Sequence, residues 1–271
     1  MLDWNPDLYL KFEKERTLPA KDLISRVEIV NPKRILDIGC GSGNSTHELK
    51  KRWPNAEIVG IDNSKSMVEK ARSLYDDTKF ILMDATEDLS PLGKFDIVFS
   101  NAAIQRIPDH ENLIKSFYDL LNDKGVLAIQ LPLIDEVEAQ KALYELEYVK
   151  KYKQYLDDKE LRFNTKSPDF YYDILSSLFN PNSIYIWTTT YTHSMDSLDD
   201  ILKWYESTTL VPYFDALPNE EIISNFKNNF YIKLKNVYSP RPNGSILFNY
   251  KRLFLVASKE IINSPIKIRY I

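Results

Sequence analysis

The sequence predicts an α/β protein whose centre is a doubly wound, mostly parallel sheet of seven strands, with a helical cap. Three observations support this fold class. Short apolar runs alternate with amphipathic stretches in the first half of the chain, two β-rich runs follow in the second half, and the first apolar run leads directly into a cluster of glycines. Strands that alternate with helices in this way form parallel sheets with helices on both faces.

The first half contains the expected parallel strands. Five apolar runs mark them, at residues 34–38, 57–61, 79–83, 95–99 and 126–131. The segments between them are mostly amphipathic, and those at 64–75 and 110–121 have the apolar spacing of helices. Residues 44–51, directly after the glycine cluster, also have helical character. The order strand, turn, helix therefore begins at the first strand and repeats along this half.

Composition changes near residue 135. Of the 17 tyrosines, three precede this point and 14 follow it. The second half keeps β-rich runs at 184–191 and 247–257, surrounded by helical, aromatic stretches at 137–156, 169–179, 198–207 and 220–234. We therefore expect one domain over residues 1–259 and a C-terminal tail at 260–271. Its expected parts are a core at about 30–134, late strands at 183–193 and 247–258, and a cap from 1–29, 135–180 and 195–245.

Composition also excludes several classes of protein. With 271 residues, 44% of them hydrophobic, the chain can bury a sizeable core, and its formal charge of -4 gives no overall attraction for nucleic acid. The single Cys40 permits neither an intrachain disulfide nor a cysteine-rich zinc site, and we expect no metal. Charged residues within the first 12 positions exclude a secretory signal, and no apolar stretch is long enough to span a membrane. We therefore expect a cytoplasmic protein with no nucleic-acid or membrane partner.

Glycine is concentrated in one place. Three of the seven glycines, Gly39, Gly41 and Gly43, follow the first expected strand within five positions. A strand that ends in glycines and opens a helix brings the backbone close to a ligand and points N–H groups at it. This geometry suits a nucleotide or a carboxylate. The spacing differs from the dinucleotide fingerprint G-x-G-x-x-G, which argues against a nicotinamide dehydrogenase.

Aspartates stand at the ends of three expected strands. Asp37 lies in the first, Asp62 ends the second, and Asp84 closes the third. Because the carboxyl ends of parallel strands meet at one edge of the sheet, where doubly wound folds bind ligands, we expect the three carboxylates to converge there. Singly, Asp62 could cap the helix that begins near Ser64, and Asp84 could be a solvated turn residue. The combination with the glycines favours a ligand site.

The run Leu36-Asp37-Ile38-Gly39-Cys40-Gly41-Ser42-Gly43 resembles motif I of class I methyltransferases that use S-adenosylmethionine. The resemblance implies that the glycine turn faces the methionine part of this cofactor, that Asp62 binds both ribose hydroxyls, and that Asp84 and Ala85 lie beside the adenine. The cofactor residues that it implies are Asp37, Gly39, Gly41, Gly43, Asn44, Asp62, Asn63, Met67, Asp84, Ala85 and Asn101.

Segments along nearly the whole chain resemble one family, the trans-aconitate 2-methyltransferases. They are residues 4–12, 15–17, 101–105, 108–110, 171–176, 187–191 and 252–257. The chain departs from the family pattern at three positions: Leu18 and Thr188 each replace an arginine, and Arg106 replaces a tryptophan. These departures concern charges that an anionic substrate would meet, so they bear on trans-aconitate as the substrate.

The resemblance implies a small polycarboxylic acid as the methyl acceptor. A carboxylate is already ionised at neutral pH, so its oxygen can attack the sulfonium methyl group without a general base, and we expect no catalytic base. Cations, hydroxyls and aromatic side chains would bind the acid. The candidates are Tyr9, Arg16, Arg106, Tyr172, Trp187, Tyr191 and His193.

Two alternatives stay open at this point. In the first, the enzyme methylates a phenol or another hydroxyl and His193 serves as the base. In the second, the protein binds the cofactor without turnover. Methylation of nitrogen is disfavoured, because the prolines and the aromatic residue that often follow the fourth strand in such enzymes are absent after Asn101, while Ala102 and Ala103 would leave room beside the sulfonium.

Overall fold

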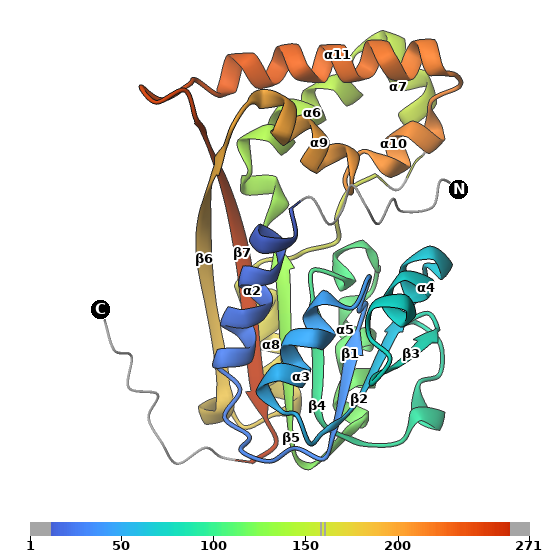
Figure 1. The fold of residues 1–271 in the computed structure, drawn as a ribbon, viewed down its shortest axis with the longest axis vertical. Helices are drawn as coiled ribbons and strands as arrows, with labels where there is room; N and C mark the ends of the chain where they lie inside the picture. Colours follow the sequence, from blue (N-terminus) through green and yellow to red (C-terminus); the bar gives the residue numbers. More distant parts are fainter. Residues whose placement is uncertain (1–11, 158, 160, 261–271) are drawn as a thin grey trace.

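The protein is described by a computed structural model that covers residues 12–157, 159 and 161–260 (Figure 1). Its centre is a seven-stranded sheet in the order β3-β2-β1-β4-β5-β7-β6. The strands are β1 (Arg34–Ile38), β2 (Glu57–Asp62), β3 (Lys79–Leu82), β4 (Phe95–Asn101), β5 (Leu121–Pro132), β6 (Ile184–Met195) and β7 (Ile246–Ser258). Strands β1 to β5 pair in parallel, and β7 pairs antiparallel with both β5 and β6. The predicted fold class is confirmed.

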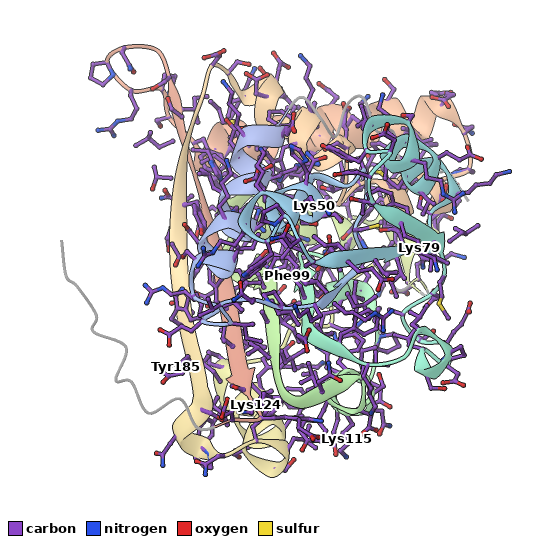
Figure 2. The ribbon with its side chains drawn as sticks, turned by 60° about the horizontal axis from the view of Figure 1, so that its bottom comes forward. Lys50, Lys79, Phe99, Lys115, Lys124 and Tyr185 are labelled. Atoms are coloured by element: carbon purple, nitrogen blue, oxygen red, sulfur yellow. The ribbon has the colours of Figure 1, made fainter. Side chains whose placement is uncertain are left out.

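Helices cover both faces of this sheet. On one face, α2 (Glu13–Ser25) and α3 (Asn44–Arg52) pack against the strands, and on the other lie α5 (His110–Asp119) and α8 (Pro168–Leu178). Helix α4 (Lys65–Leu74) packs on β2 and β3. The central strands β1 and β4 are almost wholly buried, and Figure 2 shows the fully buried Phe99 of β4 near the middle of the molecule.

A separate group of helices forms the cap above the carboxyl edge of the sheet (Figure 1). It consists of α6 (Glu138–Glu147), α7 (Lys150–Leu156), α9 (Leu198–Glu206), α10 (Val211–Ala216) and α11 (Glu220–Val237). These helices share a second hydrophobic core with the adjoining ends of β6 and β7, which contribute Met195, Ile246, Phe248 and Tyr250. Short 3₁₀ helices join the main elements: η1 (Ser90–Leu92), η2 (Ile104–Arg106), η3 (Ile134–Glu136) and η4 (Pro181–Ser183).

The cap is smaller than the sequence suggested. Residues 13–25 and 168–178 were expected in it, but α2 and α8 lie on the sheet. The reason is their apolar stripes: Leu23 and Ile24 of α2 are buried with Trp53, and Ile174 and Leu175 of α8 are buried on the opposite face. The expected helix at 137–156 is divided between α6 and α7, because Val149 has an extended backbone. The tail beyond residue 260 lies outside the described residues.

Within the described residues, no helix has the length and apolar character needed to cross a bilayer. Among the same residues, no group of three or more His, Cys, Asp or Glu side chains is arranged so that it could hold a metal ion.

Candidate active site

A cleft of about 580 Å³ lies between the carboxyl edge of the sheet and the cap. Its floor consists of the loops that follow β1, β2, β3 and β4, and its roof comes from the segments around residues 162–164 and 208–215. One side is formed by Arg16, Thr17 and Ala20 of α2. This is the position at which doubly wound sheets bind ligands.

The glycine turn after β1 forms part of the floor, and two of its glycines are required for different reasons. Gly39 has φ +70°, and a Cβ atom there would lie 2.1 Å from the Cβ of Ala103 in the loop after β4. Gly41 has φ +54°, but a Cβ atom there would have no atom within 4 Å. Since Gly41 lines the cleft, a side chain at this position would occupy ligand space.

Asp62 joins the glycine turn to the end of β2. Its Oδ2 accepts a hydrogen bond from the Gly41 N–H at 2.9 Å, and its Oδ1 accepts one from the Ser64 N–H at 2.9 Å. The cap of α4 is Ser64, whose Oγ accepts from the Met67 N–H, so the side chain of Asp62 is not the helix cap. Asp62 lines the cleft, with lone pairs that can also accept hydrogen bonds from a ligand.

Asp84 lies at the next strand end along the same edge. Its Oδ2 accepts from Asn63 Nδ2 at 2.8 Å, and its Oδ1 accepts from the backbone N–H and the hydroxyl of Thr86. Partial burial raises the pKa of Asp84, but these hydrogen bonds outweigh burial and hold the pKa below its usual value. Asp84 is therefore ionised at neutral pH. The strand ends that carry Asp62 and Asp84 are adjacent, as predicted.

Asp37 has a different position from the other two aspartates. Its side chain is fully buried, does not line the cleft, and accepts hydrogen bonds from the hydroxyls of Ser45 (2.7 Å) and Thr46 (2.6 Å) in the first turn of α3. Burial raises the pKa of Asp37 to about 6, against the opposing effect of these two hydrogen bonds. Asp37 thus fixes α3 to β1 from beneath the glycine turn.

Other predicted cofactor residues line the cleft as well. The residues that line it are Gly39, Gly41, Asn44, Asn63, Met67, Ala85 and Asn101. Gly43 does not line the cleft but directly precedes α3. Asn101 Oδ1 and Asn44 Nδ2 are buried and have no hydrogen-bond partner in the described part of the chain. Buried polar atoms are almost always hydrogen-bonded, so these two atoms favour a polar ligand in this half of the cleft.

Two arginines from distant parts of the chain line the other half. Arg16 of α2 is buried, donates to Ser207 Oγ at 2.7 Å, and stacks over Trp204 at 4.7 Å. Arg106, in η2, lies over Phe163 at 4.6 Å. Burial lowers the pKa of Arg106 to about 10, so it is still a cation at neutral pH. One Arg106 Nη atom is buried without a hydrogen-bond partner, and Arg106 forms no ion pair with any described residue.

The other predicted substrate residues are not in the cleft. Tyr172 is 45% exposed on α8, Trp187 stacks on Phe254, Tyr191 donates to Asp22, and His193 is buried against Trp204. Trp187, Tyr191 and His193 belong to β6, the edge strand of the sheet beyond β7, and Tyr172 lies on α8, so the structure does not bring these four residues into the cleft. Tyr9 lies outside the described residues.

His193 consequently cannot serve as a base in this cleft. Burial lowers its pKa to about 4, so it is neutral, and its ring packs among the aromatic residues of the cap core. Of the three departures from the family pattern, Leu18 and Thr188 are exposed and only Arg106 lines the cleft. The two lost arginines therefore do not remove charge from the cleft.

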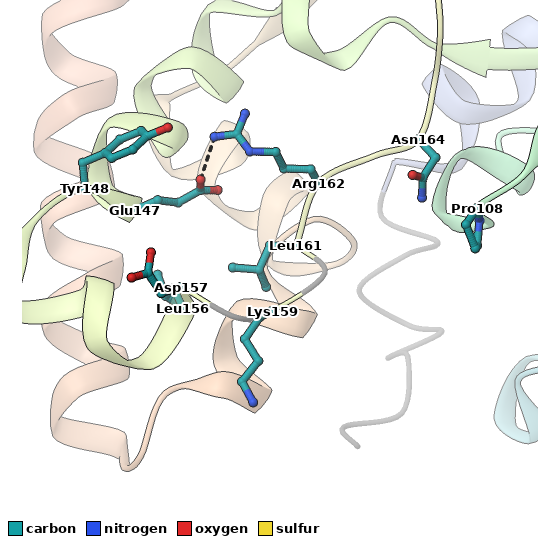
Figure 3. A pocket seen from close by; sticks show the side chains of 9 residues that line it. All are labelled: Pro108, Glu147, Tyr148, Leu156, Asp157, Lys159, Leu161, Arg162 and Asn164. Carbon is teal, nitrogen blue, oxygen red and sulfur yellow. Dashed lines mark hydrogen bonds and ion pairs between the residues drawn. The ribbon is translucent and has the colours of Figure 1, made fainter.

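Sequence reasoning missed the roof of the cleft. Phe163, Asn164 and Pro212 line it from the cap side, as does Gln105 from the loop after β4. Gln105 belongs to the segment 101–105, which carries part of the family resemblance, but the cap residues belong to segments without a periodic pattern. Arg162 lines the cleft and also a neighbouring cavity of about 370 Å³, where it pairs with Glu147 at 2.8 Å (Figure 3).

Comparisons with known proteins agree with this geometry. Residues 29–209 match the family model described as a methyltransferase domain. The chain is 37% identical to a trans-aconitate 2-methyltransferase of Rhodopseudomonas palustris (strain BisA53), over 96% of this chain and 100% of that relative. It is 38% identical to a protein of the same name from Enterobacter sp. (strain 638), with the same two coverages.

Solved structures show the same fold at lower identity. The YcgJ protein of Bacillus subtilis has a TM-score of 0.57 at 16% identity, covering 90% of this chain and 99% of its own. Phosphoethanolamine N-methyltransferase 2 of Haemonchus contortus has a TM-score of 0.52 at 18% identity, covering 89% of this chain and 52% of its own. With identities of 37% and 38% to curated relatives over 96% of its length, the chain belongs to the trans-aconitate 2-methyltransferase family of S-adenosylmethionine-dependent methyltransferases.

Proposed function

We propose that this protein transfers a methyl group from S-adenosylmethionine to a carboxylate oxygen of a small polycarboxylic acid such as trans-aconitate, forming a monomethyl ester. The observation that carries the proposal is Arg106: a guanidinium in the cleft with a buried N–H donor that no described residue satisfies. A buried cation without an anion is costly, so an anionic ligand is the favoured partner.

The cofactor half of the cleft fits S-adenosylmethionine. Open space at Gly41 leaves the backbone accessible, Asp62 can accept from two ribose hydroxyls, and Asn63 and Asp84 together present polar atoms beside Ala85 for the adenine. Asn101 Oδ1 is a further acceptor on this side. When bound, S-adenosylmethionine supplies the electrophilic methyl group.

The substrate half suits an acid with several carboxylates. Arg106 and Arg16 reach the cleft from different elements, one from η2 and the other from α2. Arg106 can donate two parallel hydrogen bonds to a carboxylate, which fixes orientation as well as charge, while Arg16, whose Nη2 already donates to Ser207, adds a second positive charge. The carboxylate that reacts is ionised near neutral pH, since its reference pKa is about 4, so no base needs to take a proton.

Catalysis would then depend on orientation and exclusion of water. The roof formed by Phe163 and Pro212 limits solvent access to the arginines, which strengthens their interaction with an anion. Correct alignment of two reacting groups in such a site accounts for a large part of many enzymes' acceleration. The chain's own contribution is therefore to hold the acid in place.

The proposal is tested by incubating the protein with S-adenosylmethionine and a panel of mono-, di- and tricarboxylates, and detecting methyl esters by mass spectrometry. We expect ester from polycarboxylates, with trans-aconitate among them. Arg106→Ala should raise KM for these acids at least about tenfold, because it removes charge-assisted hydrogen bonds. Arg241→Ala, at an exposed arginine away from the cleft, is the matched control. No ester from any polycarboxylate would refute the proposal.

A further inference from the structure

The turn that carries Arg106 rests on a buried pair of side chains outside the cleft. His110, at the start of α5, and Tyr171, in α8, are 2% and 0% exposed, and neither lines the cleft. His110 Nδ1 lies 2.6 Å from the Tyr171 hydroxyl, and His110 Nε2 lies 2.9 Å from the carbonyl oxygen of Ile104, the first residue of η2. The pair thus connects α8 to the turn.

The partners assign the protons of this pair. Burial lowers the pKa of His110, so its ring is neutral at pH 7 and carries a single N–H. A carbonyl oxygen can only accept, so this N–H is on Nε2, which donates to Ile104, and Nδ1 is left as an acceptor. The Tyr171 hydroxyl therefore donates to Nδ1, and its oxygen accepts from the Lys166 N–H at 3.2 Å. Each hydrogen bond in this series fixes the direction of the next, and the ring is the neutral Nε2–H tautomer.

A second set of hydrogen bonds holds the same turn from the cap side. The Asn164 N–H donates to the carbonyl oxygen of Gln105 at 2.6 Å, and Asn164 Nδ2 donates to that of Arg106 at 3.3 Å. The backbone N–H that donates to the Tyr171 hydroxyl belongs to Lys166, two residues after Asn164. Tyr171 consequently stabilises both η2 and the segment that packs on it.

The backbone around the turn needs such support. Ala102 and Asp109, which flank η2, have φ values of +52° and +55° and are not glycines. Residues other than glycine are strained in this region and persist there only where the surrounding structure holds them. The hydrogen bonds of His110 act on the strained segment between these two positions.

We propose that His110 and Tyr171 are positioning residues for the anion site: they hold η2 so that the Arg106 guanidinium faces the substrate carboxylate. The inference rests on the proposed function, since it assigns a purpose to the position of Arg106. Neither side chain touches the substrate in this account. Their loss should therefore weaken the recognition of the acid and leave the cofactor half of the cleft unchanged.

The test compares Tyr171→Phe, which keeps the buried ring and removes the hydroxyl, with wild type. In protein saturated with S-adenosylhomocysteine, we expect calorimetry to show trans-aconitate binding about three- to tenfold weaker, the range for one lost hydrogen bond. KM for the acid should rise with little change in kcat, and the affinity for S-adenosylhomocysteine should be unchanged. Tyr118→Phe is the control, because Tyr118 of α5 packs edge-on against Phe179 and its hydroxyl has no hydrogen-bond partner among the described residues.

His110 gives a second and independent variant. His110→Ala should weaken binding of the acid at least as much as Tyr171→Phe, and His110→Gln, whose amide can still donate to the Ile104 carbonyl, should restore part of it. Combined with Arg106→Ala, Tyr171→Phe should add almost no further loss of affinity, because both changes remove the same contact.

The outcomes separate the two proposals. If Arg106→Ala leaves KM for polycarboxylates unchanged, the anion site proposed above is wrong. If Arg106→Ala weakens binding but Tyr171→Phe and His110→Ala do not, the positioning role is wrong and the anion site stands. The positioning role is also overturned if the Tyr171→Phe and Arg106→Ala effects simply add, or if Tyr171→Phe weakens cofactor and acid binding equally.

Discussion

Gly39 and Gly41 lie two positions apart in the same turn, yet a side chain would meet different surroundings at each. Gly39→Ala would place its Cβ atom against Ala103 in a backbone conformation that alanine rarely adopts. We expect it to lower the free energy of unfolding by about 3 kcal/mol, from strain and overlap together. Adding Ala103→Gly should recover the part due to overlap, as urea denaturation can measure.

Gly41→Ala should reduce cofactor binding more than stability. Its Cβ atom would meet no atom within 4 Å, so only backbone strain remains, at about 1 kcal/mol. Binding of S-adenosylhomocysteine should nevertheless fall sharply, because the methyl group projects into the cleft. If Gly41→Ala binds the cofactor product as tightly as wild type, the turn does not face the cofactor.

The buried carboxyl of Asp37 predicts an unusual pH dependence of stability. Its folded pKa of about 6 lies above the reference value of 3.8, so its stabilising effect is fully present below pH 3.8 and is lost as pH rises through 6. Asp37→Asn keeps an acceptor for Ser45 and Thr46 but does not titrate. The free energy of unfolding of Asp37→Asn minus that of wild type should therefore be about 1 kcal/mol larger at pH 8 than at pH 5.

This difference is measured by urea denaturation of the cofactor-free protein at both pH values. A stability difference between Asp37→Asn and wild type that is the same at pH 5 and pH 8 would contradict the assignment of the raised pKa to Asp37.

At the scale of elements, α2 connects the sheet to the cap through Arg16. The arginine stacks on Trp204 of α9 and donates to Ser207, and it also lines the cleft. Two variants separate these contributions. Ser207→Ala removes the hydrogen bond but keeps the charge, and Arg16→Met keeps an unbranched side chain but removes the charge.

We expect both variants to lower the free energy of unfolding by about 1 kcal/mol, the effect of one hydrogen bond. Only Arg16→Met should also raise KM for polycarboxylates, by at least about tenfold. Steady-state kinetics with trans-aconitate provide the measurement. Equal KM values for Arg16→Met and wild type would show that Arg16 stabilises the fold but does not bind the acid.

The difference between local features and long-range strand pairing explains which sequence predictions failed. The strand, glycine turn and following helix are local features, so the turn and the ends of β2 and β3 could be located from apolar runs and turn residues. The placement of β6 could not, because it depends on pairing with β7 at the far edge of the sheet. Trp187, Tyr191 and His193 therefore had plausible residue types but the wrong location.

For the whole molecule, the sequence predicted the fold class and the cofactor half of the cleft, but little of the cap. The cap core forms between helices far apart in the chain, such as α6 and α11, and no local pattern specifies that contact. The same holds for the substrate half, where Arg16 and Arg106 line one cleft although 90 positions of sequence separate them. Composition and periodicity do not determine which residues such a fold brings together.

Cofactor binding in this fold depends most on the convergence of the glycine turn with Asp62 and Asp84 at one edge of the sheet. Calorimetric titration with S-adenosylhomocysteine tests it directly, comparing wild type with Asp62→Ala. We expect the wild type to bind one molecule and Asp62→Ala to bind at least about tenfold more weakly, because charged hydrogen bonds to the ribose are lost. An unchanged affinity in Asp62→Ala, or no binding to the wild type, would contradict the account.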